Sequence, residues 1–311
     1  MILSQNKRKA DIIKGMTEIN KLLNDYLNYL EIEKNRSVKT SANYKRYLEY
    51  FLRKTGIKTA KDITSEAVKN FRLELSRTER KKITQSYYII AIRNFLKYLA
   101  KNDIPALSPD KVELAKAPTR QIEMIDYRDL ERMLEAPETG TLRGVRDRAI
   151  LETLFSTGLR VSELCSLERY VNLERGEITV RGKGDKLRVV FLSDGAKEAI
   201  KKYLDKRSDA EEWMFVSYTK AKNPKVIGKI TSRAVQRLVD YYGRKAGVGK
   251  KVHPHLIRHS FATDLLINGA DLRSVQEMLG HASITTTQIY THLTNKELKE
   301  AHKTFHRRRR G

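Results

Sequence analysis

The chain has 311 residues, which suggests about two domains, and its 62 Lys and Arg against 38 Asp and Glu give a formal net charge of +24. The positive surplus is shared almost equally between the residues before and after residue 121, so we expect both halves to bind a polyanion such as DNA. The sequence has no run of about 18 apolar residues, no signal peptide and only one cysteine, Cys165, which predicts a cytoplasmic protein without a disulfide or a membrane partner.

Four amphipathic helices are predicted in the first third of the chain. Apolar residues recur at the three-and-four spacing of one helix face in the stretches 19–30, 38–55, 65–75 and 84–99. Ser37 and Thr64 are candidate N-caps of the second and third helices, and Gly56 is the expected end of the second. Four helices of this kind are typical of one small bundle.

A stretch that contains three prolines separates these helices from the next periodic segment. Pro105, Pro109 and Pro118, with interspersed lysines, disfavour a continuous helix and favour an extended linker. We therefore predict a basic N-terminal extension at 1–16, a helical DNA-binding domain at 17–108, a linker at 109–121, a second domain at 122–305 and a basic tail at 306–311.

The second half is predicted to be mostly helical with one small β-sheet. Two short strands are expected at 177–181 and 187–191, joined by the Gly-Lys-Gly-Asp-Lys segment between them. Helical patterns are found in the stretches 127–130, 146–157, 196–203, 232–245, 255–268 and 272–279. The predicted fold class is therefore mostly α with a small β-sheet.

Tyr290 lies near the end of the segment 280–292, where its phenol follows polar residues and does not continue an apolar stripe. A phenol can attack a phosphodiester when cations neutralise the phosphate. Arginine is suited to this task, because its planar fork donates two parallel hydrogen bonds and remains charged at every working pH. Arg160, which follows the helix break at Gly158, and Arg258 are the candidate phosphate-binding residues.

His255 precedes Arg258 by three residues, so the two side chains project from one face of a helix and can reach adjacent phosphate oxygens. His255 and His259 also have the four-residue spacing of a zinc-binding helix. Leu256 stands where a zinc hydrolase has its glutamate base, however, so we expect no metal site here.

Lys183 and His281 complete the set of six candidate catalytic residues. Lys183 lies in the predicted hairpin turn and is the candidate general acid for the 5′-oxygen leaving group, with Lys186 as the nearest substitute. His281 follows Gly280, a glycine that ends a predicted helix, so its imidazole projects from a turn and can converge with Tyr290 on one phosphate.

These motifs resemble those of the tyrosine site-specific recombinases of the phage integrase family, and their amino-acid sequences are most similar to those of the Xer branch. The resemblance covers roughly residues 17–305 and rests on four motifs in register: 157–164, 182–184, 254–259 and 280–292. It implies a DNA strand transferase that needs no metal ion, ATP or other cofactor. In such an enzyme Tyr290 forms a covalent 3′-phosphotyrosine, and strands are exchanged through a Holliday junction.

The same resemblance implies an architecture and partners. We expect a clamp on double-stranded DNA, made of an N-terminal four-helix SAM-like core-binding domain and an α-rich catalytic domain, at a specific recombination site. The implied assembly is a homotetramer on two sites, or a heterotetramer with a related recombinase, in which residues 298–305 dock on a neighbouring subunit. The implied task is the resolution of chromosome or plasmid dimers.

Three alternative functions remain open at this point. A mobile-element integrase has the same chemistry, although the stretch before Thr17 is too short for an additional arm-site domain. A type IB topoisomerase has a similar set of cations and tyrosine but relaxes DNA without a partner duplex. A catalytically silent DNA-binding module is the third alternative, and it would not need all six positions filled.

Overall fold

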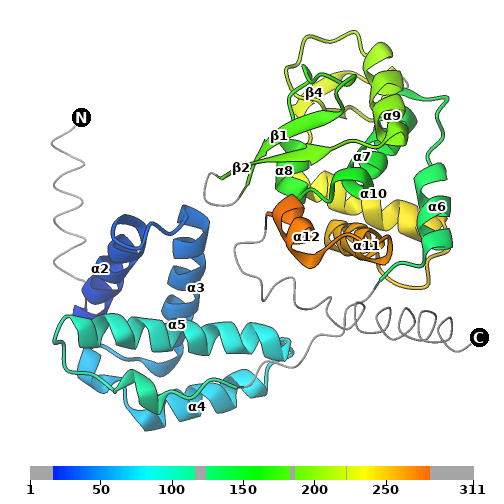
Figure 1. The fold of residues 1–311 in the computed structure, drawn as a ribbon. Coiled ribbons are helices and arrows are strands. Elements are labelled where there is room, and N and C mark those ends of the chain that lie inside the picture. The colour runs from blue at the N-terminus through cyan, green and yellow to red at the C-terminus, as the bar shows by residue number, and fades with distance from the viewer. Residues whose placement is uncertain (1–16, 116–123, 183–185, 222, 281–311) are drawn as a thin grey trace, which may run out of the picture. The chain divides into compact units, whose positions relative to one another are not determined.

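The computed structural model describes residues 17–115, 124–182, 186–221 and 223–280. The chain divides into two compact units, residues 1–120 and 121–311, both drawn in Figure 1. Helices predominate in each unit, which confirms the predicted fold class. None of the helices in the described ranges is long and apolar enough to cross a membrane.

The described residues of the N-terminal unit form a bundle of four α-helices, two of which begin at side-chain N-caps. Its elements are α2 (Glu18–Ile32), α3 (Val38–Thr55), η1 (Ala60–Asp62), α4 (Ser65–Ser76), α5 (Lys82–Lys101) and η2 (Pro109–Lys111). Both predicted N-caps are present: Ser37 Oγ accepts a hydrogen bond from the Thr40 amide (3.3 Å), and the Thr64 side chain accepts one from the Ala67 amide. Gly56 ends α3 with a φ of +68°, which a residue with a Cβ rarely adopts.

Aromatic side chains fill the core of this bundle. The ring centroids of Tyr26 and Phe95 are 5.3 Å apart, and Phe51 packs edge-on against Phe71 at 5.0 Å. Val112 is buried in the same core, so the chain stays packed through η2. Residues 109–112, which the sequence prediction assigned to the extended linker at 109–121, therefore belong to the packed N-terminal unit, because a single 3-10 turn is too short to give a periodic signal.

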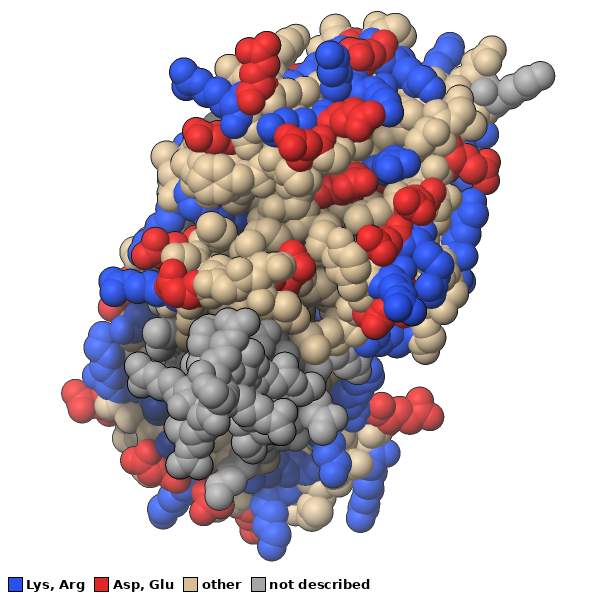
Figure 2. All heavy atoms as spheres, turned by 45° about the vertical axis from the view of Figure 1, so that its right-hand side comes forward, with Lys and Arg blue, Asp and Glu red and all other residues tan. Residues whose placement is uncertain are grey.

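Charged side chains of both signs are mixed on the surface. On the face drawn in Figure 2, Asp and Glu (red) lie among Lys and Arg (blue), with uncharged residues (tan) between many of them. The net charge of +24 is therefore not gathered into one patch on this face.

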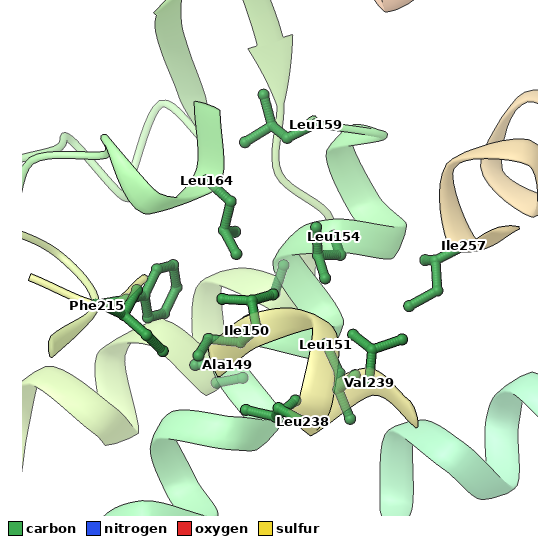
Figure 3. Packing of buried hydrophobic residues seen from close by; sticks show 14 of the residues in the cluster. Ala149, Ile150, Leu151, Leu154, Leu159, Leu164, Phe215, Leu238, Val239 and Ile257 are labelled. Atoms are coloured by element: carbon green, nitrogen blue, oxygen red, sulfur yellow. The ribbon is translucent and has the colours of Figure 1, made fainter. Parts of the chain in front are cut away.

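The C-terminal unit surrounds one central helix, α7 (Leu142–Thr157). Its side chains Ile150, Leu151 and Leu154 are at most 1% exposed and pack against residues of several other elements, as Figure 3 shows. The other elements described in this unit are α6 (Tyr127–Glu135), α8 (Val161–Cys165), β1 (Glu177–Arg181), β2 (Leu187–Phe191), α9 (Asp194–Asp205), β3 (Val216–Tyr218), β4 (Val226–Lys229), α10 (Ser232–Lys245), α11 (Pro254–Ile267) and α12 (Leu272–Leu279).

The described residues of this unit form two antiparallel sheets of two strands each, where one sheet was predicted. Strands β1 and β2 pair in register from Glu177 opposite Phe191 to Arg181 opposite Leu187, as expected. The second sheet pairs β3 with β4 and is a correction to the sequence prediction. Strands of three and four residues, with a β-bulge between them, are too short for alternation to reveal them.

Four elements bring distant parts of the chain together at the carboxyl end of α12. Helix α12, orange in Figure 1, packs against α11 and β2, and α11 also packs against α7. The end of α7 leads directly into α8. Residues near 160, 188, 258 and 280 consequently meet in space.

Candidate active site

Three of the six predicted catalytic residues lie in the described part of the chain. Arg160 is the N-cap residue of α8, and His255 and Arg258 lie in the first turns of α11. Lys183, His281 and Tyr290 lie outside the described residues. Gly182 and Lys186, on either side of the Lys183 segment, are joined by a 2.8 Å backbone hydrogen bond.

The position of Arg160 follows from the way α7 ends. Gly158 is the C-cap residue with a φ of +59°, a conformation that favours glycine. A Cβ at this position would lie 2.4 Å from Cδ1 of Phe261, so glycine is required for packing as well. The sharp turn ends α7 and places Arg160 at the start of α8.

Glu163 holds Arg160 in place through two hydrogen bonds. The Arg160 amide donates to Glu163 Oε2 (2.8 Å), and its guanidinium Nη1 donates to Oε1 (2.9 Å). Burial by itself raises the pKa of Glu163, but hydrogen bonds from Arg188 and Arg160 outweigh burial and lower it to about 2. The carboxylate is therefore ionised throughout the physiological range.

Arg188 is the residue that the sequence reasoning missed. Its Nη1 and Nη2 donate to Glu163 Oε1 (3.0 Å) and Oε2 (2.7 Å), and its Nε donates to the Met278 carbonyl (2.9 Å). One signal was present in the sequence: Arg188 shares a strand face with Val190, which is buried. A charged residue on the inward face of a predicted strand indicates a buried partner.

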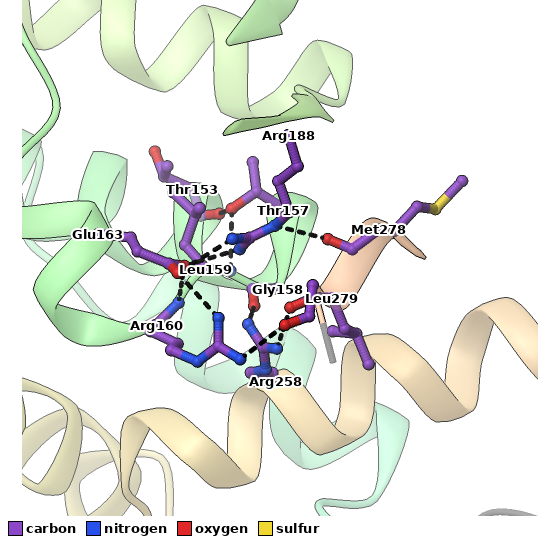
Figure 4. Close-up of polar contacts among 11 residues, drawn as sticks. Thr153, Thr157, Gly158, Leu159, Arg160, Glu163, Arg188, Arg258, Met278 and Leu279 are labelled. Carbon is purple, nitrogen blue, oxygen red and sulfur yellow. Dashed lines mark hydrogen bonds and ion pairs between the residues drawn. The ribbon is translucent and has the colours of Figure 1, made fainter. Parts of the chain in front are cut away.

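Three arginines bind three successive carbonyl oxygens at the carboxyl end of α12, as Figure 4 shows. Arg188 donates to Met278, Arg258 donates to Leu279, and Arg160 Nη2 donates to Gly280 (3.1 Å). The last carbonyls of a helix lack intrahelical partners and carry partial negative charge, so they attract cations. The guanidinium groups are thus collected around one helix end.

Arg258 also ties the ends of two helices together. Its Nη1 donates to the Gly158 carbonyl at the end of α7 (2.6 Å), while its Nη2 donates to Leu279. Only 5% of the residue is exposed. His255 and Arg258 both lie in α11, as predicted, and His255 is exposed while Arg258 is buried.

The imidazoles near this cluster are biased toward the neutral form. Surrounding protein atoms lower the pKa of His255 below its ordinary value, and the positive charges of Arg258, His253 and Arg160 lower it further. Burial likewise lowers the pKa of His259, which is partly buried. A neutral imidazole can either donate or accept a hydrogen bond at pH 7.

The described residues give this site an excess of positive charge. Of the three guanidinium groups in Figure 4, those of Arg160 and Arg188 share the carboxylate of Glu163, and that of Arg258 binds the Gly158 and Leu279 carbonyls. In the described ranges no three His, Cys, Asp or Glu side chains are grouped so that they could hold a metal ion. An arrangement of this kind suits an anion with several oxygens, such as a phosphate.

Two protein-family models match the chain. Residues 123–297 match the phage integrase family, and residues 23–103 match the phage integrase N-terminal SAM-like domain.

Curated relatives are similar over almost the whole length of the chain. Tyrosine recombinase XerD of Listeria monocytogenes serovar 1/2a is 35% identical, over 93% of this chain and 100% of the relative. Tyrosine recombinase XerC of Escherichia coli O1:K1 is 37% identical, over 95% and 100%.

Solved structures of recombinases have the same fold. XerA recombinase is 32% identical, with a TM-score of 0.51 and coverage of 93% of this chain and 99% of XerA. The Tn1549 transposon integrase bound to transposon right end DNA has a TM-score of 0.72 at 19% identity and covers 93% and 99%. The XerH recombinase bound to its difH substrate has a TM-score of 0.64 at 24% identity and covers 90% and 82%.

Proposed function

Because this chain belongs to the phage integrase family, and is a tyrosine recombinase that transfers DNA strands in site-specific recombination, we propose that Tyr290 is its nucleophile. The observation that carries the proposal is the convergence of the Arg160 and Arg258 guanidiniums at the end of α12. Tyr290 follows that helix end by ten residues in the sequence.

The proposed reaction is a transesterification in two reversible steps. The Tyr290 hydroxyl gives its proton to the neutral imidazole of His255, its oxygen forms a bond to the scissile phosphorus, and the bond from phosphorus to the 5′-oxygen breaks. Lys183 gives a proton to the departing oxygen, so a 5′-hydroxyl and a 3′-phosphotyrosine result. Attack by the 5′-hydroxyl of a partner strand reverses these changes, and neither ATP nor a metal ion enters the balance.

Arg160 and Arg258 stabilise the negative charge that grows on the phosphate oxygens during this attack. The Arg160 guanidinium uses two of its five N–H groups for Glu163 and Gly280, which leaves donors for a phosphate oxygen. Preorganised donors of this kind are typically worth roughly 10²–10³ in rate each. His255 and His281 assist with hydrogen bonds to the same phosphate.

The proposed partner is double-stranded DNA that carries a specific recombination site. Solved relatives in this fold family are bound to such DNA, and XerH is bound to difH. One tyrosine per chain cleaves one strand, so four protomers act on two duplexes, either as a homotetramer or with a related recombinase. The proposed task is the resolution of chromosome or plasmid dimers.

The nucleophile is tested by covalent capture. The DNA is first selected for binding by this protein from a pool of random duplexes, and nicks placed along it identify a suicide substrate that traps an adduct. We expect Tyr290→Phe to abolish the adduct and to leave DNA affinity almost unchanged, because the phenol oxygen contributes little to phosphate binding. The reactions contain excess EDTA.

Tyr170→Phe is the matched control, because Tyr170 is 82% exposed and lies on the surface of the same unit. It should form adduct like the wild type. An adduct that persists in Tyr290→Phe would exclude Tyr290, and cleavage that is lost in EDTA and restored by Mg²⁺ alone would indicate a metal-dependent nuclease.

A further inference from the structure

We propose that Arg188 is a positioning residue for strand cleavage: it holds Glu163 and the end of α12 together and thereby directs the guanidinium of Arg160 at the scissile phosphate. The inference rests on the proposed role of Arg160.

The contacts of Arg188 join three segments that are distant in the sequence. Its side chain extends from β2, meets both carboxylate oxygens of Glu163 and also reaches the Met278 carbonyl. Glu163 in turn contacts both the amide and the guanidinium of Arg160. Displacement of Arg188 would therefore change the position of Arg160 in two ways. It would move the Glu163 carboxylate, and it would move the end of α12, both of which bind the Arg160 guanidinium.

The backbone around Arg188 leaves just enough space for its guanidinium. A Cβ at Gly182 would lie 3.1 Å from Nη1 of Arg188, and a Cβ at Gly280 would lie 3.1 Å from its Cδ. Gly280 also has a φ of +61°. Gly182 directly precedes Lys183, and Gly280 directly precedes His281. Arg188 therefore lies next to the backbone that leads into both of these candidate catalytic residues.

The geometry assigns Arg188 a positioning role and not direct phosphate binding. All three of its side-chain nitrogens donate to protein oxygens, and two of these bonds go to the charged carboxylate of Glu163. A fork that binds both oxygens of a carboxylate fixes the direction of that carboxylate. The Glu163 carboxylate is thereby held where it can orient Arg160.

A substrate with a neutral group at the cleaved position distinguishes a role of Arg188 in positioning Arg160 from a role in the stability of the protein alone. The selected duplex is prepared with a neutral methylphosphonate at the cleaved position, and the rate of adduct formation is compared with that on the normal phosphate. Because the methylphosphonate carries no negative charge, its cleavage depends less on the position of the Arg160 guanidinium. We expect Arg188→Met to be slowed roughly 10- to 100-fold on the phosphate and less than about threefold on the methylphosphonate.

Arg207→Met is the matched control. Arg207 is also a buried arginine that joins a carboxylate, Asp209, to backbone carbonyls, but it does so within the 205–214 loop. Its replacement should lower stability and leave the ratio of the two rates as in the wild type. Equal slowing of Arg188→Met on both substrates overturns the inference.

Two further variants make the outcome decisive. If Arg160→Met shows no relief on the methylphosphonate, the proposed role of Arg160 fails; if Arg160→Met is relieved and Arg188→Met is not, only the role of Arg188 fails. Should Arg188→Met not fold, Arg188→Lys replaces it. Lysine keeps the charge but cannot hold Glu163 by a two-pronged fork, so the same pattern is expected with a smaller effect, and a wild-type rate on the phosphate overturns the inference.

Discussion

At the scale of single residues, contacts within the protein bring positive groups together at the candidate site. Arg160 and Arg188 share the carboxylate of Glu163, and the end of α12 supplies three carbonyl oxygens to the arginines. Carbonyl dipoles compensate a guanidinium less completely than a full negative charge does. This incomplete compensation supports the proposal that the site binds a DNA phosphodiester.

The general acid can be isolated by changing the leaving group. With a 5′-phosphorothiolate at the scissile bond the departing thiolate needs no proton, so Lys183→Ala should cleave this substrate at nearly the wild-type rate. On normal DNA the same variant should be slower by roughly 10²-fold or more. Single-turnover cleavage of both duplexes measures the difference. Equal impairment on both would assign the acid to Lys186, His255 or His281.

Glu163 should make stability depend on pH in a predictable window. Its pKa is about 2 in the folded chain and 4.5 ordinarily, so its contribution is complete above pH 4.5 and is lost as the pH falls toward 2. The shift corresponds to roughly 3 kcal/mol. We expect Glu163→Gln to lower the free energy of unfolding by about this amount at pH 7, and the deficit to shrink below pH 4.5.

Urea unfolding followed by the fluorescence of Trp213 measures this deficit, because Trp213 is the single tryptophan of the chain and lies in the C-terminal unit. Glu198→Gln serves as the control, since Glu198 forms an exposed ion pair with Lys202. A deficit for Glu163→Gln that is constant from pH 7 to pH 2 would contradict the prediction.

At the scale of elements, the site depends on how helices end. Both α7 and α12 stop at glycines with positive φ, Gly158 and Gly280, and the carbonyl oxygens at these ends accept the guanidinium donors. Helix ends leave carbonyl groups unpaired, so a terminus is a natural place to hold an arginine. The geometry of the candidate site therefore depends on the positions at which α7 and α12 end.

The α7 terminus gives a prediction for stability. Gly158→Ala introduces a strained φ and a Cβ 2.4 Å from Phe261, whereas Gly247→Ala introduces a strained φ of +74° with no atom within 4 Å. We expect a loss of about 1 kcal/mol for Gly247→Ala and of about 2–4 kcal/mol for Gly158→Ala. Trp213 fluorescence during urea unfolding reports both values. Equal losses would show that Phe261 moves aside without cost.

At the scale of the whole molecule, the excess charge predicts how DNA affinity responds to salt. A chain of net charge +24 that contacts many phosphates releases counterions when it binds. Affinity for the selected duplex should fall by roughly 10³-fold or more between about 50 and 200 mM salt. Fluorescence anisotropy of a labelled duplex measures the slope. A nearly flat salt dependence would mean that few lysines and arginines contact the backbone.

Much of the fold could be predicted because helix formation is encoded locally. Ser37 and Thr64 cap helices, Gly56 and Gly158 end them, and the apolar spacing of α10 and α12 gave their bounds as the structure has them. The fold class followed from these signals. The second sheet and η2 were not predicted, because elements of three or four residues are too short to show a periodic pattern of apolar residues.

For the candidate site, the sequence determined which residue types stand in which motifs, and so indicated a phosphodiester chemistry. Only the tertiary structure placed Arg160, Arg188 and Arg258 at one helix end, with Glu163 between the first two. Arg188 escaped notice because its partners lie 25 and 90 residues away in the sequence. Local periodicity reports on neighbours along a chain, whereas a buried ion pair is fixed by packing between segments that are far apart in sequence.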